Sequence, residues 1–179
     1  MNDYLAQFQG FARNDPPRAA AGIVTLAGTL ALAIVYFSQY VLLLAPCPLC
    51  LEQRYAFYVA VPLAALLWLG ASHGAARKVL IAGFVVIAGV MLWNTGLAAY
   101  HAGVEWKFWA GPNECSGPID KLGSVRDMMN QLQRVRLVRC DEASWRFLGL
   151  SLAGWNVPLS LALAVVAAWG AKASHARQE

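Results

Sequence analysis

Four cysteines are the residues of this 179-residue chain with the most distinctive chemistry, and they fall into two pairs. Cys47 and Cys50 have the C-x-x-C spacing, in which the pKa of a thiol is often lowered so that the reactive thiolate forms more readily. Cys115 and Cys140 are more widely separated, and both lie in polar, turn-rich sequence. A thiolate of one pair could attack a disulfide of the other, which is how electrons pass between cysteine pairs. The sequence therefore permits a thiol–disulfide relay, among other arrangements.

Arg54 follows Cys50 by one helical turn, so a helix beginning near the C-x-x-C pair would present both residues on one face. Backbone amides at the helix start would stabilise a thiolate, and Cys50 is better placed for this than Cys47. The guanidinium could add to that stabilisation and donate hydrogen bonds to a polar ligand at the membrane boundary. Alternatively, Arg54 is a snorkelling side chain that anchors a helix end. The spacing does not separate these two interpretations.

Two other interpretations compete with a relay at the wider pair. A structural disulfide between Cys115 and Cys140 would stabilise the fold by about 3–4 kcal/mol through loop-closure entropy. A closed zinc site could use all four cysteines. Structural zinc sites usually repeat the C-x-x-C knuckle, which the second pair lacks. We therefore expect no metal, while the structural disulfide and the relay both remain open.

The elements that position these residues follow from the distribution of charge. The chain is 59% hydrophobic and 13% charged, whereas an ordinary soluble domain is about 25% charged. Four stretches contain no Asp, Glu, Lys or Arg: 19–51, 55–76, 79–104 and 147–171. Each exceeds the roughly 20 residues that cross a bilayer, and none shows the polar stripe of a soluble core helix. We predict four transmembrane helices with cores near 20–44, 55–72, 79–100 and 150–171.

The predicted fold class is all-α, an integral membrane four-helix bundle that spans residues 1–179 as a single domain. In the long polar loop at 101–146, apolar residues recur at helical spacing: Leu122, Val125, Met129, Leu132 and Val135. This predicts a short amphipathic helix that lies on the membrane surface or packs on the loop itself. The cysteine loops at 45–54 and 101–146 are two crossings apart, so we expect them on the same side of the bilayer.

The orientation of the chain in the membrane depends on a short turn, because basic residues occur on both sides overall. The turn at 72–78 carries Arg77 and Lys78 without an acid, which favours a cytoplasmic position for it and for both termini. Cysteine pairs persist in oxidising compartments, so we expect the cysteine loops on the other side. The basic residues form no stripe with interleaved aromatics, which argues against a nucleic-acid partner.

The run PCPLCLEQR at residues 46–54 resembles the DsbB family of bacterial disulfide bond formation proteins. The similarity continues in CDE at 140–142 and WRFLGLS at 145–151. Helix count, loop lengths and cysteine placement also agree along nearly the whole chain. A C-x-x-C alone is a weak signal, whereas this combination is specific. The resemblance implies a multi-pass protein of the bacterial inner membrane, with cytoplasmic termini and periplasmic cysteine loops.

The resemblance also implies a protein-dithiol:quinone oxidoreductase. A DsbA-like periplasmic thioredoxin-fold partner would attack Cys115 of a Cys115–Cys140 disulfide, and the released Cys140 would attack Cys47. Cys50, freed as a thiolate, would pass electrons to the membrane quinone pool, with Arg54 beside the quinone oxygens. Ubiquinone and menaquinone both remain open as the acceptor.

His101 resembles a histidine that borders the quinone site in this family, and a solvated loop histidine is the alternative. The first helix carries no acidic residue, although some family members have one, so a role for such an acid is absent here. Two rival functions remain. A vitamin K epoxide reductase-like protein shares the helix count, but its C-x-x-C is expected late in the bundle. The other rival is a non-catalytic membrane protein with structural disulfides.

Overall fold

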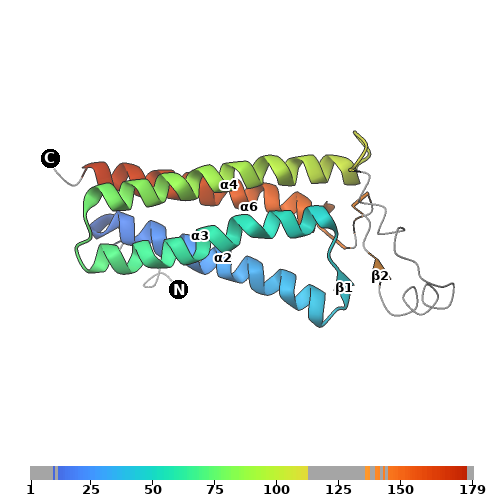
Figure 1. The fold of residues 1–179 in the computed structure, drawn as a ribbon, viewed down its shortest axis with the longest axis horizontal. Helices are drawn as coiled ribbons and strands as arrows, with labels where there is room; N and C mark the ends of the chain where they lie inside the picture. The colour runs from blue at the N-terminus through green and yellow to red at the C-terminus, as the bar shows by residue number, and fades with distance from the viewer. Residues whose placement is uncertain are drawn as a thin grey trace. The chain divides into compact units, whose positions relative to one another are not determined.

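A computed structural model describes residues 10, 12–112, 136–137, 140–141, 143 and 145–176 of the chain. Within these residues there are four long helices: α2 (Pro16–Tyr40), α3 (Pro48–Ser72), α4 (Arg77–Glu105) and α6 (Leu152–Ala176) (Figure 1). Four short strands accompany them: β1 (Leu44–Ala45), β2 (Arg136–Leu137), β3 (Arg146–Phe147) and β4 (Leu150–Ser151). Cys115 and the predicted amphipathic helix lie outside the described residues.

The four helices confirm the predicted all-α membrane fold. Each is long and apolar enough to cross a membrane. Their bounds differ from the prediction in two places that matter for the site. The second helix begins at Pro48, so Cys50 lies in its first turn and not in a loop. The third helix continues to Glu105, so it contains His101, which the sequence had placed after the helix end.

The first helix ends at Tyr40, earlier than the predicted 44, although the sequence stays apolar. Leu43 has a φ of 53°, a left-handed conformation that an α-helix does not contain. The chain then forms β1, whose backbone hydrogen bonds go to β2. Pairing of this segment with another strand therefore ends the helix, and a count of charged residues could not have shown this.

The described chain divides into two compact units, and each long helix contributes to both. The first unit contains Met1–Leu30, Ala56–Trp93 and Leu159–Glu179. Its helices pack through small residues, as is common between membrane helices. A Cβ atom added to Gly170 would lie 2.8 Å from the Phe84 ring and 2.9 Å from Ala20. Glycine at this position thus permits the close approach of α6 to α4 and α2.

The second unit contains Ala31–Tyr55 and Asn94–Pro158, and it holds all the described cysteines. The parallel pairing of β1 with β2 joins the segment before Cys47 to the segment before Cys140 (Figure 1). β3 and β4 form an antiparallel hairpin whose two turn residues, Leu148 and Gly149, both have positive φ. A type I′ turn requires this conformation, and the hairpin leads directly into α6.

Candidate functional site

The C-x-x-C pair forms the first turn of α3. Pro48 occupies the first helical position, where its fixed φ suits a helix and its missing amide hydrogen costs no bond. Cys47 is the N-cap residue, since its carbonyl accepts a hydrogen bond from the Leu51 amide at 3.1 Å. The Cys50 amide donates to Cys47 Sγ at 3.1 Å, in the way that a capping side chain accepts from the third helical residue.

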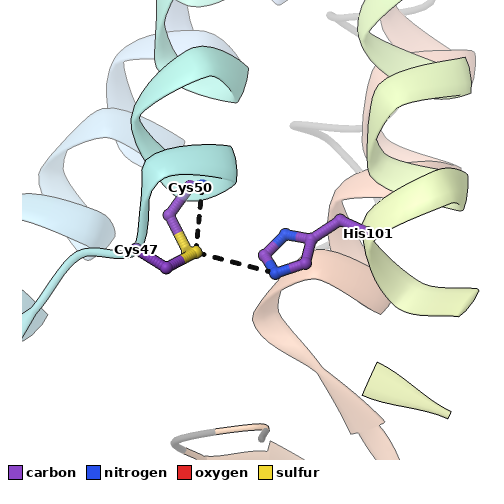
Figure 2. Close-up of side chains that lie close together, drawn as sticks. All are labelled: Cys47, Cys50 and His101. Atoms are coloured by element: carbon purple, nitrogen blue, oxygen red, sulfur yellow. Dashed lines mark hydrogen bonds between the residues drawn. A yellow bond between two sulfur atoms is a disulfide. The ribbon is translucent and has the colours of Figure 1, made fainter. Parts of the chain in front are cut away.

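Cys47 and Cys50 form a disulfide at the start of α3 (Figure 2), and the two side chains differ in burial. Cys47 is 1% exposed, whereas Cys50 is half-buried. The amide contact at the helix start reaches Cys47, although the sequence had suggested Cys50 as the better-placed sulfur. The two members of one motif are therefore distinct, with Cys47 enclosed by protein and Cys50 more accessible.

Cys140 shares a buried cluster with Cys47. The cluster also contains Leu49 and Val104, and Cys50 packs against it. Cys140 is fully buried and is itself disulfide-bonded. The structure thus brings a member of the second pair together with the first pair. The predicted role of Cys115 stays a prediction.

His101 on α4 contacts both cysteine segments. Its Nε2 atom lies 3.7 Å from Cys47 Sγ (Figure 2), and the backbone of Cys140 hydrogen-bonds to the same residue. The side chain is 2% exposed. The alternative of a solvated loop histidine is therefore wrong, because α4 continues past this residue and protein surrounds the ring.

Two amide side chains that the sequence analysis missed hold the imidazole in place. Gln53 Nε2 lies 2.7 Å from His101 Nδ1, and Asn156 Nδ2 donates to Gln53 Oε1 at 2.6 Å. With the amides in this orientation, Gln53 donates to Nδ1, and the ring proton resides on Nε2, which faces Cys47. An available signal was Asn156, a polar residue within an apolar helix.

Glu105 and Ser151 complete the polar surroundings of the imidazole. Glu105 Oε1 lies 3.9 Å from His101 Nε2, one helical turn farther along α4. The Ser151 hydroxyl donates to Glu105 Oε2 and accepts from the Gly154 amide at 3.0 Å. Ser151 is thus the N-cap of α6 and the hydrogen-bond partner of a buried carboxylate. Both residues were also missed, although Glu105 is the first acid after the charge-free stretch 79–104.

Arg54 lies one turn after Cys50 and is buried, with 8% of its surface exposed. Its guanidinium donates to Gln39 Oε1 at 2.7 Å and lies 5.5 Å from the centre of the Tyr36 ring. Among the described residues it forms no salt bridge. A snorkelling side chain would extend along an exposed surface. Arg54 is instead enclosed, and within the described part of the chain it places a cation without a paired carboxylate one helical turn after the more accessible cysteine.

This arrangement suits thiol redox chemistry. Two cysteine segments meet at a buried imidazole, and hydrogen-bonded amides fix the ring that faces Cys47. Cys47, Cys50 and His101 also offer ligand atoms that all lie within 4.8 Å of one another. In the disulfide the two sulfurs are bonded to each other, so the oxidised pair offers no thiolate to a metal.

Comparisons with a family model and with individual proteins point to the same family. The profile of the family described as "Disulfide bond formation protein DsbB" matches residues 17–170. The protein named Disulfide bond formation protein B from Albidiferax ferrireducens is 35% identical over 166 residues, 86% of this chain and 90% of that protein. The protein of the same name from Xanthomonas axonopodis pv. citri is 36% identical over 150 residues, 80% and 83% of the two chains. No solved structure matches the chain.

Replacement of Ser151 by alanine tests the junction between α4 and α6. The Gly154 amide loses its capping acceptor, which typically costs about 1 kcal/mol, and the buried Glu105 carboxylate loses a donor, which adds about 1–3 kcal/mol. We expect Ser151→Ala to lower the thermal unfolding temperature of the detergent-solubilised protein. Ser72→Ala is the matched control, because that hydroxyl bonds the Leu69 carbonyl at an exposed position. Equal unfolding temperatures for the two variants would contradict the assignment.

Proposed function

Because this chain belongs to the DsbB family, and so is a disulfide-generating oxidoreductase that spans the membrane several times, we propose that it connects a dithiol protein to quinone. The dithiol is that of a DsbA-like thioredoxin-fold protein, and the acceptor is ubiquinone or menaquinone. One observation carries the proposal: Cys47 and Cys140 lie in a single buried cluster. Members of the two pairs then share one buried environment, which isolated structural disulfides do not require.

Each exchange step breaks one disulfide bond and forms another, so the number of disulfide bonds stays constant. The partner thiolate attacks Cys115 of a Cys115–Cys140 disulfide and releases Cys140, which attacks Cys47 and releases Cys50. The partner's second thiolate then attacks its own mixed disulfide, leaves oxidised, and frees Cys115. Attack of Cys115 on Cys140 restores that disulfide and leaves Cys47 and Cys50 as thiols. Re-formation of the Cys47–Cys50 disulfide removes two electrons and two protons from the chain.

Burial of Cys47 makes its charged form costly, so the residues around it have to stabilise a departing thiolate. The Cys50 amide, 3.1 Å away, can donate to the sulfur. His101 Nε2 lies 3.7 Å from the same atom, and a proton on that nitrogen can be donated toward it. Gln53 keeps that proton on Nε2 by donating to Nδ1. These contacts support a role for Cys47 as the sulfur that both bonds to Cys140 and leaves it.

The residues near Cys50 fit a lipid-soluble acceptor with carbonyl oxygens. A guanidinium has five N–H donors, and the described contacts of Arg54 give one of them to Gln39. The Tyr36 ring beside Arg54 stacks on that of Tyr40, and the chain neighbours Leu51 and Tyr55 also have exposed side chains. Arg54 would therefore hold a quinone, which when bound supplies a two-electron, two-proton acceptor, while a quinone contact of His101, whose ring faces Cys47 and Gln53, stays a prediction. The half-buried Cys50 is the cysteine placed to deliver electrons there.

We assign the chain to the bacterial inner membrane, with both termini cytoplasmic and the cysteine loops periplasmic. The basic turn between α3 and α4 supports this orientation, because short basic loops remain in the cytoplasm. The periplasm is the oxidising compartment in which disulfides persist.

A purified system tests the proposal. The detergent-solubilised protein is mixed with quinone and a reduced DsbA-like protein, and quinone absorbance is followed. We expect steady quinone reduction by the unaltered chain and none by Cys50→Ser, because serine cannot re-form the disulfide. Unfolding temperature and secondary structure check that the variant is folded. Turnover by a folded Cys50→Ser variant would favour structural disulfides and contradict the relay.

Arg54 is tested by its effect on the Michaelis constant for quinone. A hydrogen bond to a charged group contributes about 1.5–3 kcal/mol, so Arg54→Ala should raise KM for quinone by about 10- to 100-fold. The KM for the dithiol partner should change little. Arg54→Lys should recover part of the loss, since lysine keeps the charge without the planar fork. An unchanged quinone KM in Arg54→Ala would remove Arg54 from the proposed site.

The contact between the two pairs can be trapped. The double variant Cys50→Ala, Cys115→Ala leaves Cys47 and Cys140, which should oxidise to a disulfide detectable by peptide mass spectrometry. The matched control, Cys47→Ala with Cys115→Ala, leaves Cys50 and Cys140. We expect slower bridging there, because Cys50 lies at the border of the cluster that Cys47 and Cys140 share. Equal rates would show that this cluster does not direct the exchange.

A further inference from the structure

Cys47, Cys50 and His101 together have the side-chain types of a metal site. A redox-active disulfide by itself would need only the two cysteines. One ligand atom from each of the three residues lies within 4.8 Å of the others (Figure 2). Two ligands of one tetrahedral zinc ion lie roughly 3.5–3.8 Å apart, given bonds of about 2.3 Å to sulfur and 2.0 Å to nitrogen. Opening the disulfide and shifts of about 1 Å would bring these three atoms to such spacings.

A fourth donor stands outside this group of three and would have to move toward the sulfurs to join it. Glu105 Oε1 lies 3.9 Å from His101 Nε2, and Glu105 is 9% exposed. Two thiolates, one imidazole and one carboxylate are all ligand types that zinc accepts, and their combined charge exceeds that of the ion by one unit. With that movement of Glu105, the site would have four donors for a small divalent cation.

The residues behind these ligands also match a metal centre. Metal-binding imidazoles usually donate a hydrogen bond from their second nitrogen, and the group in reach of His101 Nδ1 is the Gln53 amide at 2.7 Å, which would have to present its oxygen. The second oxygen of Glu105 accepts from Ser151. Ligation through Nε2 moves the ring proton to Nδ1. A 180° flip of the Gln53 amide then lets its oxygen accept this proton. The Asn156 amide flips as well, so that its oxygen accepts from the Gln53 nitrogen.

We propose that the reduced Cys47–Cys50 pair, together with His101 and Glu105, binds a zinc-like d¹⁰ divalent cation, and that the disulfide form does not. Reduction of the disulfide by a dithiol consumes two electrons and two protons and gives two thiols. The cation then displaces both thiol protons and forms two metal–sulfur bonds. Cys115 and Cys140 contribute no ligand, which distinguishes this site from a closed four-cysteine zinc site.

The site goes beyond the proposed function, because binding requires neither quinone nor partner. Its consequence for turnover does rest on that function. A cation held by both sulfurs prevents Cys47 and Cys50 from re-forming their disulfide, so it would inhibit only the reduced form of the protein.

Cadmium serves as the test ion, since its bonds to thiolates give an ultraviolet charge-transfer absorption. The variant Cys115→Ser, Cys140→Ser retains only the proposed pair of thiols. It is purified in detergent, reduced with a phosphine, desalted and titrated with Cd²⁺. We expect one ion per reduced chain with the thiolate absorption, and no such absorption after oxidation of the pair. Equal binding by the oxidised and reduced forms overturns the proposal.

Histidine variants test the ligand set, also in the fully reduced chain with all four cysteines if the serine variant does not fold. We expect His101→Ala to weaken the binding of one Cd²⁺ by at least about tenfold, as loss of a metal-site residue typically does. Glu105→Gln should weaken it less. His73→Ala is the control, because that side chain is exposed in the turn after α3. A folded His101→Ala variant that binds Cd²⁺ as tightly as His73→Ala contradicts the proposal.

These measurements contain no quinone and no partner. Failure of cadmium binding would therefore leave the proposed relay intact, and failure of the relay would leave the metal site intact.

Discussion

The imidazole of His101 imposes the constraint on which the rest of the site depends. A ring that is 2% exposed has to satisfy both nitrogens within the protein, because an unpaired polar group costs several kcal/mol in apolar surroundings. Gln53 from α3 contacts one nitrogen, and the other faces Cys47 and Glu105. The start of α3 and the end of α4 are thus joined through one residue. Asn156 extends the same network to α6.

The strand pair β1–β2 adds a second, independent connection within this unit. Its register aligns Leu44 with Arg136 and Ala45 with Leu137, a few residues before Cys47 and Cys140 respectively. Backbone hydrogen bonds therefore bring the two cysteine segments together without depending on the oxidation state of any sulfur. Burial of Cys47 and Cys140 in one cluster is consistent with this arrangement. A relay needs such a connection, because the disulfides themselves open and close during exchange.

The sequence predicted which long helices form better than it predicted where each helix begins and ends. Charge-free stretches identified all four described long helices, since crossing a bilayer requires continuous apolar residues. They could not show that α4 continues to Glu105, because the hydrogen bond from the distant Ser151 makes a buried acid tolerable there. The cysteines and Arg54 were identifiable from motif and spacing. Gln53 was not, because its importance arises from contacts between residues far apart in the chain, and Asn156 gave only the signal of a polar residue within an apolar helix.

The first turn of α3 gives two chemically identical residues different environments. Cys47 is the N-cap, and the chain directs its sulfur back onto the Cys50 amide and toward His101. Cys50 occupies the third helical position, where its own amide is used by Cys47 and its side chain remains half-buried. Pro48 enforces this difference by fixing the backbone between them. The enclosed sulfur therefore suits exchange with Cys140, and the accessible one suits an acceptor from the membrane. The direction of the proposed electron flow then follows from the geometry of one helical turn.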